Sequence, residues 1–108
     1  MAVEVRSKEL YTRALKLKGE ISQIDISVEE CAEYIQSLIK IKRCNEGLYE
    51  KDVAIEKSIE EAVDVIIMIE QMIITFNKEE LFNDMKKRKL DRLDKRLNLL
   101  EEGKGGKK

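Results

Sequence analysis

Residues 28–35 read VEECAEYI, and residues 59–66 read IEEAVDVI. The two segments share one pattern: an apolar residue, two glutamates, two small or apolar residues, a third acid, an apolar residue and isoleucine. In each copy the second glutamate and the third acid stand three positions apart, so on an α-helix they lie on the same face. The repeat therefore predicts two helices, each presenting a pair of carboxylates.

The composition is typical of an all-α protein. Among 108 residues there is no proline, glycine occurs five times, aromatic residues are 5% and charged residues are 40%. We therefore expect a single all-α domain over residues 1–102, followed by a disordered basic tail at 103–108. Apolar spacing and breaks at Gly19 and around Gly47 predict four helices, at about 7–18, 22–43, 50–76 and 77–102. Asn77, with Glu80 three positions later, resembles a capping box at the start of the fourth helix.

Apolar patterning indicates which faces of the second and third helices are buried. The second helix carries an apolar stripe at helical spacing, which we expect to be its buried face: Ile24, Val28, Cys31, Ile35, Leu38 and Ile39. Residues 65–76 are apolar on nearly every side, which predicts a helix buried all round. So short a four-helix chain has difficulty covering both faces of such a helix. We therefore expect a second subunit to complete the bundle.

Charge and targeting signals narrow the functional classes. Net charge is −1, but the middle of the chain is acidic and both ends are basic, a layout suited to a metal and a small polyanion. The first ten residues are interrupted by charges, and the longest apolar run covers only residues 65–69. We therefore expect a soluble, cytoplasmic protein with no membrane partner.

The acids of the repeat predict a metal site. Four carboxylates facing each other across two helices would hold a hard divalent cation: Glu30, Glu33, Glu61 and Asp64. Histidine is absent and the two cysteines lack a metal-type spacing, which favours Mg²⁺, with Mn²⁺ as a substitute, over zinc, copper or iron. Mg²⁺ is usually bound together with substrate phosphates, so the site indicates phosphoryl or nucleotidyl chemistry. Glu29 is the candidate to orient or deprotonate the attacking water, and a plain solvent-facing role remains its alternative.

Glu29-Glu30-Cys31-Ala32-Glu33, followed by Glu61-Ala62-Val63-Asp64, resembles the E-E-x-x-E and E-x-x-D motif of the MazG-like all-α nucleoside triphosphate pyrophosphohydrolases. Gln23 and the stretches 64–71 and 89–97 also resemble short phage-type and bacterial members, so the likeness covers roughly residues 10–97. It implies a MazG-like bundle that hydrolyses a nucleotide between its α- and β-phosphates, with magnesium held by the four acids. It also implies a homodimer or a dimer of dimers with the nucleotide near the subunit boundary, and contact of Gln23 with the nucleoside.

A triphosphate bound beside acids needs cationic partners. The candidates are Lys42, Arg43, Lys86, Lys89 and Arg92. Lys89 and Arg92 are favoured, because they stand three positions apart on one helix face and lie within the resembling stretch. A solvated helix surface is the alternative for each.

Two other functions stay open. The chain could be a non-catalytic helical interaction or assembly module, whose apolar third helix binds a partner. It could also bind nucleic acid through the basic fourth helix, which is the weaker reading of the charge pattern. The preferred base or sugar, and the choice between a triphosphate and a diphosphate, cannot be read from the sequence.

Overall fold

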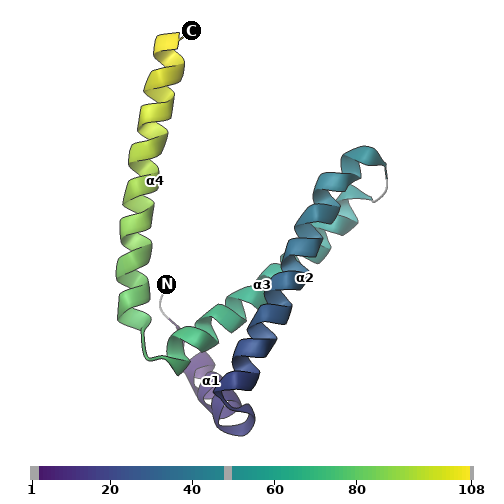
Figure 1. Ribbon diagram of the computed structural model, residues 1–108, viewed down its shortest axis with the longest axis vertical. Helices are drawn as coiled ribbons and strands as arrows, with labels where there is room; N and C mark the ends of the chain where they lie inside the picture. Colours follow the sequence, from purple (N-terminus) through teal and green to yellow (C-terminus); the bar gives the residue numbers. More distant parts are fainter. Residues whose placement is uncertain (1–2, 48–49, 108) are drawn as a thin grey trace. The chain divides into compact units, whose positions relative to one another are not determined.

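The computed structural model describes residues 3–47 and 50–107 (Figure 1). It describes side chains up to Gly103. Throughout that part of the chain the regular structure is helical, which confirms the all-α class. The described residues form four α-helices and a short 3-10 turn: α1 (Val5–Lys18), α2 (Glu20–Arg43), η1 (Cys44–Glu46), α3 (Lys51–Thr75) and α4 (Glu79–Lys107). Contacts divide these elements into one unit of α1, α2 and α3 and another formed by α4. That residues 1–102 form one domain stays a prediction.

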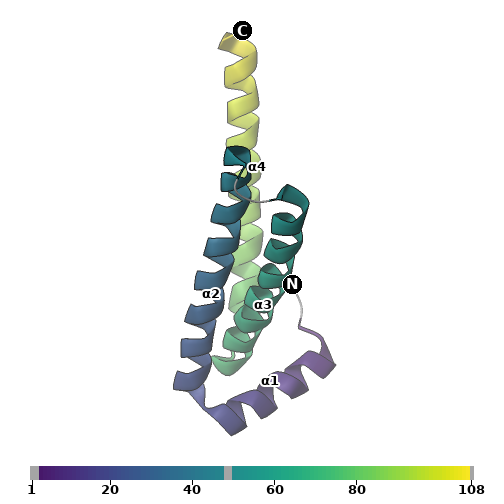
Figure 2. The same ribbon diagram turned by 90° about the vertical axis from the view of Figure 1, so that its right-hand side faces the viewer.

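The first unit is built on the antiparallel pair α2 and α3, which lie side by side in both ribbon views (Figures 1 and 2). Their connection passes through η1 and Gly47, whose φ of 74° lies in the left-handed region that glycine adopts at little cost. Helix α1 packs mainly against α3. It ends where predicted, at Gly19, whose amide donates to the carbonyl of Leu15 at 2.8 Å.

The least exposed face of α2 is polar. Gln23 and Ser37 are buried, and Ser27, Glu30 and Tyr34 between them are half-buried, so the stripe recurs every three or four residues. The buried residues in the first half of α3 are likewise small or polar: Ala54, Ser58 and Glu61. Such residues let two helices approach closely, and this polar stripe is what α2 contributes to the unit.

The serine hydroxyls in this interface are satisfied within their own helices. Ser37 Oγ donates to the Tyr34 carbonyl at 2.6 Å, Ser58 Oγ to the Ile55 carbonyl at 2.8 Å, and Ser27 Oγ to the Gln23 carbonyl at 2.8 Å. Hydroxyls bonded back to the preceding turn need no partner across the interface. Buried serine is therefore tolerated here without unpaired donors.

The predicted buried stripe of α2 is wrong for the single chain. Val28, Cys31, Ile35, Leu38 and Ile39 are exposed, with Val28 64% accessible, and only Ile24 is half-buried. A helix in a two-helix pair can turn only one face inward, and α2 turns the face with the small residues and Glu30. Part of its apolar face lines an open groove of about 650 Å³, together with Met72 of α3 and Phe76 at the end of that helix.

The expectation that residues 65–76 are buried all round is also wrong for the single chain. Met68 and Ile73 are buried, whereas Ile66, Ile67, Ile69 and Phe76 are exposed. Helix α1 covers part of this segment, where Tyr11 Oη donates a 2.6 Å hydrogen bond to Glu70 Oε1. Burial, followed by the hydrogen bond to Glu70 and its charge, raises the pKa of Tyr11 to about 12. Helices α1 and α2 each pack against one side of α3 and leave its remaining sides uncovered.

Helix α4 begins later than the capping-box reading predicts. Its first residue is Glu79, and the carbonyl of Lys78 accepts from the amide of Phe82 at 2.9 Å, so Lys78 holds the N-cap position. Asn77 has a φ of 54° and follows the end of α3. Asparagine tolerates the left-handed conformation that commonly terminates helices. The predicted cap at Asn77 is therefore wrong, because this residue closes α3 and does not open α4.

Helix α4 continues past its expected end at residue 102 to Lys107. Residue 108, and the side chains from 104 onward, lie outside the described residues, and the disorder expected of the tail at 103–108 stays a prediction. Of the helices in the described part of the chain, none combines the length and apolar character needed to cross a membrane.

Candidate metal centre

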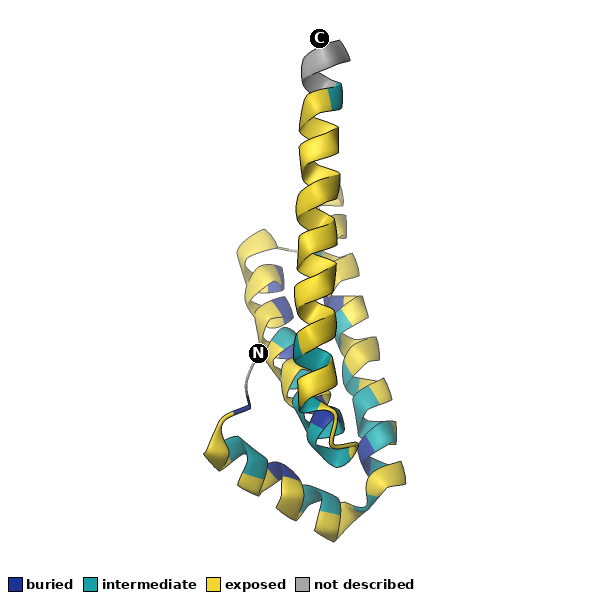
Figure 3. Ribbon diagram, turned by 90° about the vertical axis from the view of Figure 1, so that its left-hand side faces the viewer, coloured by how far each residue is buried: buried dark blue, intermediate teal, exposed yellow. Residues whose placement is uncertain are grey.

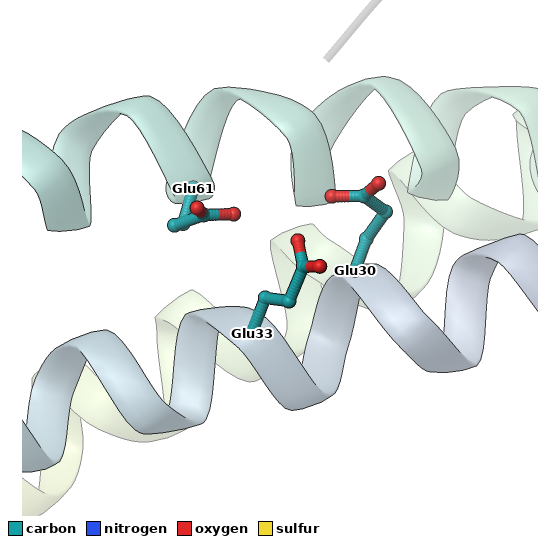
Figure 4. A group of neighbouring side chains, drawn as sticks. All are labelled: Glu30, Glu33 and Glu61. Carbon is teal, nitrogen blue, oxygen red and sulfur yellow. The ribbon is translucent and has the colours of Figure 1, made fainter.

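Three glutamates converge between α2 and α3 (Figure 4). Glu30 and Glu33 point from α2 towards α3, and Glu61 points from α3 towards α2. One carboxylate oxygen from each of the three lies within 4.8 Å of the others. The predicted meeting of acids from both copies of the repeat is confirmed for these three residues.

The local sequence explains how the acids meet. The three-residue spacing puts Glu30 and Glu33 on one side of α2. Ser58 lies one turn before Glu61, and Ser37 one turn after Glu33, and both serines are buried. Small side chains in these flanking turns let the helices come close enough for glutamates to reach across the gap.

Burial leaves part of the acid cluster unpaired. Glu61 is 7% exposed, and its Oε2 is buried without a hydrogen-bond partner. Oε2 of Glu30 is buried and unpartnered in the same way. An unpaired buried carboxylate oxygen is costly, since it has left water and gained no donor in return.

The electrostatics of Glu30 reflect this crowding. Burial raises the pKa of Glu30, and the negative charges of Glu33, Asp64, Glu61 and Glu29 raise it further. Like charges at short range disfavour the ionised form. A cation between the helices would relieve this repulsion.

Lys57 is a member of the cluster that the sequence reasoning missed. Its Nζ lies 3.0 Å from Oε1 of Glu61 and 3.8 Å from Oε1 of Glu60. The hydrogen bond to Glu61 raises the pKa of Lys57, and the charges of Glu60, Glu61 and Glu33 add to the rise. The signal that could have found it is its place four residues before Glu61, on the same helix face.

Asp64 and Glu29 lie at the edge of the cluster. Asp64 is half-buried one turn after Glu61, and its charge reaches Glu30, but it is not among the three acids whose oxygens converge. Glu29 is exposed on α2 beside Glu30. The structure thus brings three of the four predicted ligands together, with the fourth and the candidate base close by.

Gln23 is among the most buried side chains, at 2% exposed. A nucleoside could reach it only if the surrounding helices moved, so its proposed contact stays a prediction. Gln71 on α3 was not among the predicted site residues, yet its Oε1 is buried without a hydrogen-bond partner. Gln71 follows Glu61 by as many residues as Gln23 precedes Glu33, so in the antiparallel pair both glutamines fall on the same side of the acids.

The two predicted cationic residues on α2 lie away from the acids. Arg43 lies ten positions after Glu33, about 15 Å along the helix, and its Nε is 3.5 Å from Oε2 of Glu46. Lys42 beside it is exposed. The other three, Lys86, Lys89 and Arg92, are exposed residues of α4, which forms a unit of its own.

The donor set fits a hard divalent cation. The converging groups are all carboxylate oxygens, and Mg²⁺ takes oxygen ligands at about 2.1 Å in octahedral geometry, which puts pairs of ligand oxygens about 3 to 4 Å apart. Oxygens within 4.8 Å of one another would need only small side-chain rotations to reach that spacing. The two unpartnered oxygens of Glu30 and Glu61 are the atoms that such an ion would satisfy.

Comparisons with known proteins identify no relative of this chain. No family model, no curated protein and no solved structure matches the chain.

Proposed function

We propose that the chain is a magnesium-dependent nucleoside triphosphate pyrophosphohydrolase, which cleaves between the α- and β-phosphates and yields a nucleoside monophosphate and pyrophosphate. One observation carries the proposal: Glu30, Glu33 and Glu61 converge from the two copies of the repeat and leave two buried oxygens without a partner. The resemblance of both acid motifs to the MazG-like enzymes supplies the reaction. Mg²⁺ is the expected cofactor, and Mn²⁺ is expected to substitute.

The residues that would hold the ion are Glu30, Glu33 and Glu61, with Asp64 as a fourth ligand from the next turn of α3. When bound, Mg²⁺ would neutralise phosphate charge and make a water molecule more acidic. Lys57 would have to release Glu61 to an ion, and its ammonium group could then pair with a phosphate oxygen. Its exposed position on α3 leaves it free to turn outward.

Glu29 is proposed as the general base. It is exposed next to Glu30, so its carboxylate can accept a proton from water while remaining outside the ligand set. The water oxygen then forms a bond to the α- or the β-phosphorus, and the bond between that phosphorus and the oxygen that bridges the two breaks. The electron pair leaves on the bridging oxygen, with pyrophosphate after attack on the α-phosphorus or with the nucleoside monophosphate after attack on the β-phosphorus. Glu29 carries the proton away until it exchanges with solvent.

Substrate binding requires groups beyond the acids. Gln23, with Gln71, is proposed to meet the nucleoside after a movement of the helices that bury Gln23. The triphosphate is assigned to five basic residues, of which the last two are favoured: Lys42, Arg43, Lys86, Lys89 and Arg92. A homodimer or dimer of dimers is proposed to complete the binding site, which agrees with the exposed apolar residues of α2 and α3. We expect the protein to act in the cytoplasm, without nucleic acid as a partner.

The test is pyrophosphate release from a panel of ribo- and deoxynucleoside triphosphates, with Mg²⁺ and with chelator. We expect release that requires the metal, and we expect Glu61→Gln to lower kcat/KM by at least about 100-fold. Glu60→Gln is the matched control. Glu60 is the exposed neighbour of Glu61, and the change removes the same charge. The kcat/KM of this variant should stay within a few-fold of wild type. Full activity of Glu61→Gln would refute the assignment of the site.

A second candidate, a non-catalytic helical interaction module, is supported by the open apolar groove along α2 and α3. On that reading Mg²⁺ would leave the stability of the protein unchanged, and neutral substitutions at Glu30 and Asp64 would be tolerated. Absence of pyrophosphate release from every nucleotide, together with no effect of Mg²⁺ on thermal unfolding, would favour this module.

A further inference from the structure

The C-terminal helix carries a leucine seam that neither the metal site nor the proposed reaction uses. Four leucines of α4 are spaced by three, four and three residues: Leu90, Leu93, Leu97 and Leu100. This is the a and d spacing of two heptads, which places all four on one narrow stripe of the helix. All four are exposed, and α4 is coloured as exposed along most of its described length (Figure 3).

The charges that flank this seam are ordered by sign. With Leu90 and Leu97 at a positions, the g positions hold Lys89 and Arg96, and the following e positions hold Asp94 and Glu101. One side of the stripe is therefore basic and the other acidic. All four charged residues are exposed.

This order selects one orientation for a pair of such helices. In a parallel coiled coil, a g residue meets the e residue five positions later on the partner helix. That arrangement pairs Lys89 with Asp94 and Arg96 with Glu101, and each pair occurs twice by symmetry. An antiparallel pair would instead bring g against g and e against e, so that basic residues would meet basic residues and acids would meet acids. Charge complementarity thus favours the parallel arrangement and a second copy of the same helix as partner.

We propose that α4 is a self-association surface, which pairs with α4 of a second copy of this chain as a parallel two-stranded coiled coil over residues 89–101. The seam is short, because Lys86 occupies the preceding d position and Asn83 the preceding a position. Two heptads are fewer than the three or four of a sustained coiled coil. The association through this surface is therefore weak and reversible. Its main contribution is to set the parallel orientation in which two copies of α4 pair.

Charge reversal on the full-length chain tests the pairing. Lys89→Glu with Arg96→Glu makes the g positions acidic, and Asp94→Lys with Glu101→Lys makes the e positions basic. Each double variant then has like charges at every g–e contact of its own homodimer. Equal mixtures of the two restore opposite charges at every contact between unlike chains.

Sedimentation equilibrium over a wide range of protein concentration measures the association. We expect wild type to self-associate, each double variant to do so on the order of 50-fold more weakly, and the mixture to form heterodimers at least as tight as wild type. The matched control is Arg88→Glu with Lys95→Glu, since both residues occupy f positions on the outer face of the seam and carry the same change in net charge. This control should associate like wild type, and far-ultraviolet circular dichroism should show equal helix content in all variants.

Three results would overturn the proposal. One is a monomeric wild type, which would mean that the leucines pack within their own chain or against another partner. Another is unchanged association of both double variants, which would place the dimer contact elsewhere. The third is equal weakening in the f-position control, which would reduce the effect to net charge. All readouts are molecular mass and helix content, so they do not depend on whether the chain is an enzyme.

Discussion

Replacing Glu30 by Gln should stabilise the metal-free protein at neutral pH, although it removes a proposed metal ligand. Burial and four neighbouring acids raise the pKa of Glu30. An acid whose pKa rises on folding holds its proton more tightly in the native state. Stability is therefore greatest at low pH and falls as the pH rises from the unfolded pKa through the folded one. The ionised Glu30 thus destabilises the native state at neutral pH, and Glu30→Gln removes that charge.

Coulomb's law gives the size of the effect. Two unit charges about 5 Å apart, close to the 4.8 Å limit between the acids, repel by roughly 1 kcal/mol in water and roughly 3 kcal/mol at an effective dielectric constant of about 20. Glu33 is exposed, so the lower figure applies to it, and Lys57 offsets part of the charge on Glu61. We expect the free energy of unfolding to rise by about 1–2 kcal/mol, with about 4–8 °C in Tm for each kcal/mol.

Thermal unfolding followed by circular dichroism, in chelator and at low salt, is the assay. The gain should shrink at acidic pH and at high salt, and added Mg²⁺ should stabilise wild type more than Glu30→Gln. Glu56→Gln is the control, because it removes a charge from an exposed position of α3 and should leave Tm nearly unchanged. A Tm of Glu30→Gln at or below wild type would refute the reasoning, since it would mean that the ionised carboxylate has a favourable partner.

Two further predictions concern groups that pair with acids of α3. Tyr11→Phe should lower the free energy of unfolding by about 1–2 kcal/mol, measured by chemical denaturation, because Glu70 loses a 2.6 Å hydrogen bond. The pKa of Tyr11 is raised from 10.0 to about 12, so this contribution to stability should be complete below pH 10 and lost as the pH approaches 12. An ultraviolet titration in which every tyrosine ionises with an ordinary pKa would contradict this prediction. Lys57→Gln should tighten Mg²⁺ binding about two- to fivefold in calorimetric titrations, because it removes the ammonium group that competes for Glu61, and weaker binding would show that Lys57 supports the ion instead.

The sequence predicted the helices well because their signals are local. Gly19 and Gly47 lack a side chain that would oppose positive φ, and both mark helix breaks that the sequence alone places correctly. The convergence of Glu30, Glu33 and Glu61 was also predictable, since an i, i+3 spacing fixes a helix face and the repeat supplies two such faces. Asn77 was misassigned because the same residue type both starts and ends helices, and only its φ of 54° decides between the two.

The inward face of α2 could not be predicted from hydrophobicity. Apolar residues at Val28 and Ile35 make the stronger stripe, but α3 packs against the stripe of Ser27, Glu30 and Ser37. The serines can face inward because each hydroxyl bonds to a carbonyl of its own helix, so that its burial leaves no donor unpaired. Lys57 was missed for a related reason, since its exposed position on α3 gives no apolar signal, and its role depends on which face of α3 meets α2.

Two buried serines lie one turn from the acid cluster, Ser37 on α2 and Ser58 on α3. Ser37 and Ser58 hold their hydroxyls against their own helices, so they act as thin spacers and do not tie one helix to the other. The turns that flank the meeting carboxylates therefore carry two of the smallest side chains in the interface. Any enlargement at either serine would be expected to push the two helices apart without touching an acid, and so to change the size of the cation that the proposed site could hold.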